Sequence, residues 1–176
     1  QRAREAAARE KERLLKEFSV TGVETIVDAG DSARRLDVVI VGDAWAAEDM
    51  DDYRSACGKM ARQIVEKVPP FCYYSEFVNF HRVDLVSPVS GVEAGKPERT
   101  PLGSALSENK PPILTSNFGA AVRYARLARD CDLLVVLVNT TGARSTGGRG
   151  GVTLVKTGID LTVVHEFGHA FAGLAD

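Results

Sequence analysis

Two short apolar runs constrain the fold more than any other feature: LDVVIVG at residues 36–42 and DLLVVLVN at 132–139. Both are rich in aliphatic, largely β-branched residues without polar alternation, which is typical of strands buried on both faces of a sheet. Strands of this kind need helices on either side, and the neighbouring segments have matching patterns. We expect helices at 44–68, 117–131 and 161–176, and further strands at 77–87 and 151–158.

This order of elements predicts the α/β fold class, with a mixed, largely parallel twisted sheet and flanking helices. The 151–158 segment alternates and contains Lys156, which indicates a strand at the sheet edge. We expect residues 1–35 to form an N-terminal helix and linker, and residues 36–176 to form one domain. The chain begins with Gln and shows no signal peptide, so we expect it to be part of a longer protein.

Composition narrows the class of protein. Apolar residues make up 44% of the chain and charged residues 26%, as in ordinary soluble domains. A net charge of -2 argues against a nucleic-acid partner, and no apolar run approaches the ~20 residues of a membrane span. Three cysteines are too few for a disulfide framework, so one bridge with a free thiol and three buried thiols both remain open.

The segment LTVVHEFGHAFAGLAD at 161–176 carries the strongest chemical signal. Residues four apart lie on the same face of a helix, so His165 and His169 would present two imidazoles to one metal ion. Glu166 lies about 100° round the helix and could reach a water bound to that metal. Bound Zn²⁺ lowers the pKa of its water towards ~7, and a carboxylate can then take the proton.

A catalytic zinc usually has three protein ligands. Gly173 suits a left-handed residue that ends the helix, after which the chain could return Asp176 to the metal as the third ligand. The five-residue pattern also occurs by chance, and His and Glu can be half-buried core residues held by hydrogen bonds.

Three other features have a simpler interpretation. The run STGGRGG at 145–151 lacks the form of a phosphate-binding loop and leads into a strand, so we interpret it as a mobile wall of a cleft. His81 lies within a predicted strand, where a packed histidine is commoner than a ligand. Cys131 precedes a buried strand and is expected to be inert.

Several ordered segments resemble the clostridial-type IgA metallopeptidase family, a group of zinc endopeptidases in the zincin clan. HEFGHAFAGLAD is similar to the family's H-E-F-G-H-S-F-x-G-L-A-D-E-Y motif, and LDVVIVGDAWAAEDM to its I-V-I-L-G-D-G-Y-T-x-x-E-M segment. FVNFHRVDLVSPVSGV and VLVNTTGARSTGG resemble two further segments of the family. The resemblance covers residues 36–176 and implies a zincin-like catalytic domain with its active-site helix at the C-terminal end.

The resemblance implies a zinc endopeptidase with a protein or peptide substrate, secreted or held in the periplasm or at the cell surface of a bacterium. His165, His169 and Asp176 match zinc ligands, and Glu166 matches the general base. The substrate would lie beside the 151–158 strand, against the residues Gly151, Val152, Thr153 and Leu154. Two departures from the family pattern, at 44–46 and at 143–144, bear on specificity, so immunoglobulin cleavage is not carried over.

The chain also stops before the Glu-Tyr that follows in the family motif, so the resemblance implies a C-terminally truncated domain with an incomplete catalytic floor. Two functions of other classes stay open at this point. One is a non-catalytic, zinc-stabilised binding module of a secreted or surface protein. The other is a metal-dependent hydrolase that acts on a bond other than a peptide.

Overall fold

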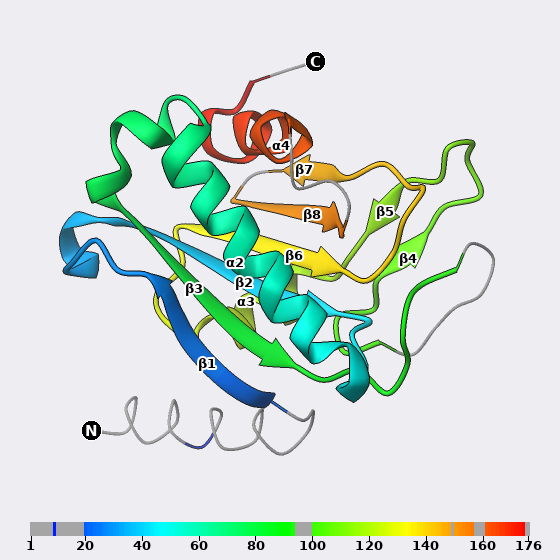
Figure 1. Cartoon of the computed structure of the whole chain (residues 1–176). Coiled ribbons are helices and arrows are strands. Elements are labelled where there is room, and N and C mark those ends of the chain that lie inside the picture. The colour runs from blue at the N-terminus through cyan, green and yellow to red at the C-terminus, as the bar shows by residue number, and fades with distance from the viewer. Residues whose placement is uncertain (1–8, 10–19, 94–99, 149, 157–160, 175–176) are drawn as a thin grey trace.

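The computed structural model describes Arg9 and residues 20–93, 100–148, 150–156 and 161–174. Its main sheet has six strands in the order β1-β3-β2-β6-β8-β7, and β4 and β5 form a separate two-stranded ribbon (Figure 1). The strands are β1 (Val20–Val27), β2 (Leu36–Asp43), β3 (Val78–Leu85), β4 (Ala105–Leu106), β5 (Leu114–Thr115), β6 (Leu133–Val138), β7 (Thr146–Gly148) and β8 (Gly151–Val155). The α-helices are α2 (Met50–Lys67), α3 (Phe118–Ala125) and α4 (Leu161–Ala172).

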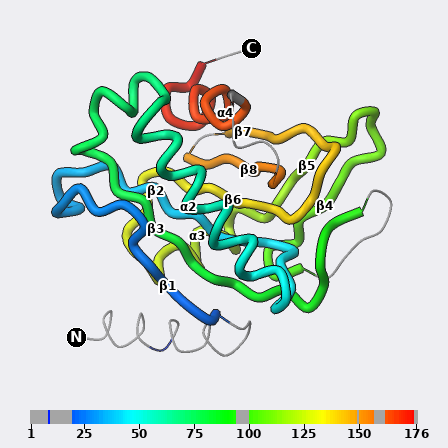
Figure 2. The backbone as a smooth tube through the Cα atoms, viewed as in Figure 1, coloured from blue at the N-terminus to red at the C-terminus, as the bar shows by residue number. Residues whose placement is uncertain are grey.

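The four inner strands β3, β2, β6 and β8 run parallel to one another, and β1 and β7 join them antiparallel at the two edges. The predicted α/β class and the mixed, largely parallel sheet are therefore confirmed. The two apolar runs became β2 and β6, which lie side by side at the centre of the sheet. Figure 2 shows β1 and α4 near opposite ends of the sheet.

Helices cover both faces of the sheet. On one face, α2 and α4 share a core with alternate residues of the inner strands, including Ile40, Phe80 and Leu154. On the other face, α3 packs through Ala121, Tyr124 and Ala125 against a second core. A sheet covered on both faces needs apolar residues along its whole central strands, which is why β2 and β6 lack polar alternation.

The prediction that residues 151–158 form a strand at the sheet edge is wrong. β8 pairs with β6 on one side and with β7 on the other, so it is an interior strand, and all five of its residues are buried. The outermost strand at this end is β7, within the segment that we expected to be a Gly-rich loop. β7 was missed because glycine is depleted in strands and adds no alternating pattern.

Other boundaries also differ from the expectation, and one of them is the end of α3 at Ala125, where the predicted helix continued to residue 131. β1 lies in the segment predicted to be a linker, so the sheet extends beyond residue 36 towards the N-terminus. The predicted helix at 44–68 begins only at Met50, because Ala44 has a left-handed φ of 60° and the indole of Trp45 donates a hydrogen bond to the Leu137 carbonyl, 2.8 Å away. The predicted helix at the N-terminus lies outside the described residues, apart from Arg9.

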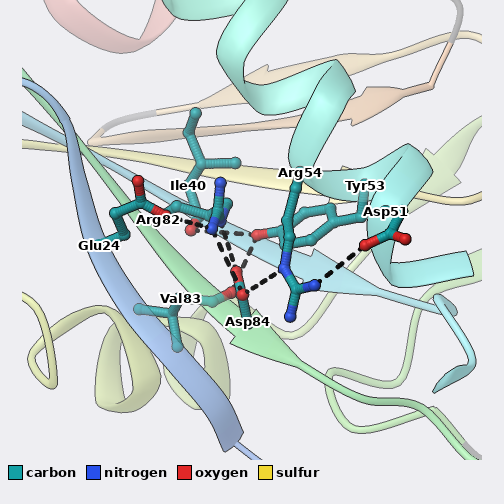
Figure 3. Close-up of polar contacts among 8 residues, drawn as sticks. All are labelled: Glu24, Ile40, Asp51, Tyr53, Arg54, Arg82, Val83 and Asp84. Atoms are coloured by element: carbon teal, nitrogen blue, oxygen red, sulfur yellow. Dashed lines mark hydrogen bonds and ion pairs between the residues drawn. The ribbon is translucent and has the colours of Figure 1, made fainter.

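A network of charged side chains joins β1, β3 and α2 (Figure 3). Arg82 donates to Asp84 on the same strand and to Glu24 of β1, where the nitrogen–oxygen distance is 2.6 Å. Arg54 of α2 donates to Asp84 from 2.9 Å. Burial alone would lower the pKa of Arg82, but the hydrogen bond and charge of Asp84 raise it above its usual value. These pairs allow charged residues to lie beneath α2.

His81 is buried on β3 and is held by two side chains. Its Nε2 lies 2.9 Å from Asp37, and its Nδ1 lies 3.0 Å from the Thr25 hydroxyl. The prediction that it is a packed histidine is confirmed.

Among the described residues, no helix is long and apolar enough to cross a membrane.

Candidate active site

The apolar face of α4 fixes how the helix is oriented. Val163, Phe167 and Ala170 are buried in the core shared with α2, and the Phe167 ring meets Phe71 edge-on at a centroid distance of 5.6 Å. Apolar residues spaced three and four positions apart lie on one face of a helix. Because this face of α4 packs on the core, the opposite face points outwards. His165 and His169 lie on that outward side, where His165 is exposed and His169 is half-buried.

The two imidazoles are brought together as the spacing predicts. Nε2 of His165 lies 3.0 Å from Nε2 of His169, and the rings meet nearly perpendicular with centroids 4.6 Å apart. Two nitrogens bound to one tetrahedral zinc at about 2.0–2.1 Å would lie roughly 3.3 Å apart. The pair therefore fits two ligands of a single zinc ion after a small adjustment.

The end of α4 sets the proton position on His169. Gly173 has a left-handed φ of 64°, as expected for a residue that ends a helix, and the chain turns so that the Leu174 carbonyl lies 2.7 Å from Nδ1 of His169. A carbonyl oxygen can only accept, so Nδ1 carries the proton in this contact. The lone pair of neutral His169 is then on Nε2, the nitrogen that faces His165. A backbone carbonyl in this position is a common support for a metal-binding histidine.

The third predicted ligand, Asp176, lies outside the described residues. Within the described ranges, no group of three or more His, Cys, Asp or Glu side chains is arranged to hold a metal ion. The donor set on the described residues is thus the two imidazoles of His165 and His169. This set suits zinc, and it needs at least one further ligand to match a catalytic site.

Glu166 lies beside the histidine pair but points towards the sheet. Only 7% of its surface is exposed, and it packs against Gly147 of β7. A Cβ atom at position 147 would lie 2.6 Å from Oε2 of Glu166, which is closer than Cβ atoms approach other heavy atoms in proteins. The carboxylate therefore lies in a narrow space between helix and strand, and the absence of a side chain at Gly147 makes that space possible.

A cleft of about 730 Å³ opens between α4 and β7, and we call it the α4–β7 cleft. The histidines and Glu166 line one side, and residues of the Gly-rich segment line the other. The described lining residues are Ile113, Arg144, Ser145, Thr146, Gly147, Gly148, His165, Glu166, His169, Gly173 and Leu174. The expected cleft wall in the Gly-rich segment is confirmed, although it is a strand. The residues predicted for substrate binding, Gly151, Val152, Thr153 and Leu154, are absent from this lining.

A protein-family model described as IgA Peptidase M64 matches residues 24–176, which is most of the chain. The chain belongs to the IgA peptidase M64 family. The match begins within β1, so it includes the second half of a strand that was predicted to be part of the linker. It confirms the family that the ordered motifs resemble, and it places the His165–His169 pair in a member of a peptidase family. No curated protein matches the chain.

Proposed function

We propose that this member of the IgA peptidase M64 family is a zinc-dependent endopeptidase. In this proposal His165 and His169 bind Zn²⁺, Asp176 completes the ligand set, and Glu166 is the general base. The observation that carries it is the pair of Nε2 atoms 3.0 Å apart on one face of α4, beside a buried carboxylate in an open cleft. Family membership supports peptide hydrolysis as the reaction.

Zinc bound by the two histidines would polarise the scissile carbonyl and make a water molecule acidic enough to attack it near neutral pH. Glu166 accepts the proton of the attacking water and later delivers it to the leaving amine. Its packing against Gly147 limits the orientations of the carboxylate, which favours proton transfer to one position in the cleft. The Leu174 carbonyl keeps His169 in the tautomer that this role requires.

The peptide substrate is proposed to lie along β7. β8 has partners on both sides and cannot add a further strand, whereas in the described part of the sheet the outer edge of β7 has no strand paired over Thr146–Gly148. A peptide could add there through main-chain hydrogen bonds, with its scissile bond near Gly147 and Glu166. This replaces the substrate position expected beside 151–154.

The first test is the zinc content of the purified chain, measured by elemental mass spectrometry. The wild type should contain about one zinc ion per chain, and His165→Ala should contain none. Thr162→Ala is the matched control, because Thr162 is exposed on the same helix and should leave the zinc in place. A zinc-free wild type after incubation with zinc would overturn the proposed site.

Two further measurements test the third zinc ligand and the metal dependence of the reaction. Asp176→Ala should weaken zinc binding by about 10-fold or more. Hydrolysis of a peptide mixture should stop when a chelator removes the metal and return when zinc is added. Zinc retained at full occupancy without hydrolysis of any peptide would favour the non-catalytic binding module.

A further inference from the structure

Arg144 lines the α4–β7 cleft, two residues before the start of β7, and pairs there with residues 112–114 at the start of β5. Its main chain is held on the ribbon by two hydrogen bonds. Its N–H donates to the Pro112 carbonyl from 2.7 Å, and its carbonyl accepts from the Leu114 N–H at 2.9 Å. Ile113 pairs with it in a parallel bridge. The backbone of Arg144 is therefore fixed relative to the cleft, although its side chain is exposed.

The charge of Arg144 has no partner in the described part of the chain. Arg54 and Arg82 both form ion pairs with Asp84, but no described residue forms a hydrogen bond or ion pair with the Arg144 guanidinium. Arg144 is also the only Lys or Arg among the described residues that line the cleft. An unpaired guanidinium on a backbone that is held beside a binding cleft favours a carboxylate, which it can bind through two parallel hydrogen bonds.

The pairing of β7 shows which part of a peptide would reach this charge. Antiparallel addition is the more stable arrangement, and it would place residues that follow the scissile bond towards the N-terminal end of β7. Arg144 precedes Gly147 by three positions, or roughly 10 Å along an extended chain. A peptide cleaved near Gly147 would therefore bring about its third residue after the cleaved bond to Arg144.

The same end of the cleft is closed to a longer strand. Residues 112–114 already occupy the edge beside Arg144, and Thr146 donates through its hydroxyl to the Leu114 carbonyl from 2.9 Å. A bound peptide must end or bend away here. Its carboxylate could be the free C-terminus or the side chain of Asp or Glu, and Arg144 would bind both in the same way.

We propose that Arg144 is a specificity-determining residue that binds a substrate carboxylate about three residues after the scissile bond. This inference rests on the proposed peptidase function and on the placement of substrate along β7. It assigns the enzyme a preference for acidic or C-terminal sequences on that side of the cleaved bond.

The test is a cleavage profile of a mixed peptide library, read by mass spectrometry. The wild type should enrich Asp, Glu or a free C-terminus about three residues after the cleavage site, by roughly 10-fold over neutral peptides. Arg144→Gln should lose this enrichment, and Arg144→Glu should shift it to Lys and Arg. Arg129→Gln is the matched control, because Arg129 is an exposed arginine that follows α3 on the opposite face of the sheet. Its profile should equal that of the wild type.

A second library with amidated C-termini separates the two sources of the carboxylate. If the enrichment of Asp and Glu persists in the amidated library, Arg144 binds an acidic side chain. If the preference for cleavage near the C-terminus disappears in that library, Arg144 binds the terminal carboxylate. A binding assay in the Glu166→Gln background gives an independent readout. Fluorescent peptides that end in a free carboxylate or contain Glu should bind about 10-fold more tightly than their neutral counterparts, and Arg144→Gln should remove the difference.

The outcomes distinguish this inference from the proposed function. Cleavage by the wild type with no acidic preference, or with a preference that Arg144→Gln leaves unchanged, would overturn the inference and leave the peptidase proposal in place. Carboxylate-dependent binding without cleavage of any peptide would support Arg144 and contradict the peptidase proposal. If the protein neither cleaves any peptide nor shows carboxylate-dependent binding, the inference about Arg144 and the peptidase proposal are both overturned.

Discussion

Gly147 of β7 lies directly against Glu166 of α4. A Cβ atom at position 147 would come within 2.6 Å of the Glu166 carboxylate and 2.8 Å of its main-chain oxygen. One of these contacts is with backbone, which cannot rotate away. The helix that carries both histidines therefore packs against the edge strand only because residue 147 has no side chain.

Gly147→Ala should consequently move α4 away from β7. We expect a loss of about 1–3 kcal/mol in the free energy of unfolding, together with reduced peptide hydrolysis, because an added methyl group overpacks this contact. Chemical denaturation and peptide kinetics would measure the two effects. Gly148→Ala is the control, since a Cβ at position 148 would meet nothing within 4 Å. Equal behaviour of the two variants would show that the contact is unimportant.

Glu166→Gln should separate metal binding from catalysis. Glutamine keeps the size of the side chain beside Gly147 but cannot accept the proton of the attacking water. We expect zinc content to stay at the wild-type level and kcat to fall by about 10²–10⁴-fold. Elemental analysis and peptide kinetics on the same sample would measure both. Loss of zinc in this variant would contradict the assignment of Glu166 as base rather than ligand.

The charged network beneath α2 should respond unequally to the removal of its two acids (Figure 3). The Asp84 side chain is 4% exposed and pairs with both Arg82 and Arg54, whereas the Glu24 side chain is 62% exposed. Asp84→Asn should cost about 3–5 kcal/mol, because it leaves the buried Arg82 charge poorly compensated. Glu24→Gln should cost less than about 1 kcal/mol. Urea denaturation of both variants tests this, and similar losses would refute it.

Thr153 offers a stabilising substitution in β8. Its hydroxyl oxygen is buried and has no hydrogen-bond partner among the described residues. Thr153→Val keeps the shape and removes the unsatisfied group, so we expect a gain of about 1 kcal/mol in the free energy of unfolding. Thr146→Val is the opposite case, because the Thr146 hydroxyl donates to Leu114, and it should lose about 1 kcal/mol. Thermal denaturation of the pair would show whether the signs differ.

The thiols should differ in reactivity. All three cysteines are free, and burial raises the pKa of Cys57 to about 12 and that of Cys131 to about 11. Their reactive thiolate forms are therefore scarce at pH 8. Cys72, partly exposed between α2 and β3, should be labelled first by a thiol reagent in the folded protein. Cys72→Ser should remove that early labelling, and rapid labelling that survives the substitution would contradict the raised pKa values of Cys57 and Cys131.

The central elements could be predicted because their patterns are local. A β-branched run such as 36–42 is compatible with little except a strand buried on both faces, and the apolar spacing of three and four residues from Met50 to Ile64 requires a helix. The helical repeat also brings His165 and His169 onto one face, whatever surrounds the helix. These features depend on residues within one or two turns of each other.

Only the tertiary structure decided which strand forms the wall of the cleft. β7 and β8 are both short strands, and their order in the sheet depends on which of them pairs with β6, which neither sequence encodes by itself. The contact of Gly147 with Glu166 and the position of Arg144 in the cleft follow from that order. The spacing of the two histidines is thus a property of the sequence. The surface that faces them is a property of the packing, because it is built from segments that meet only when the sheet has formed.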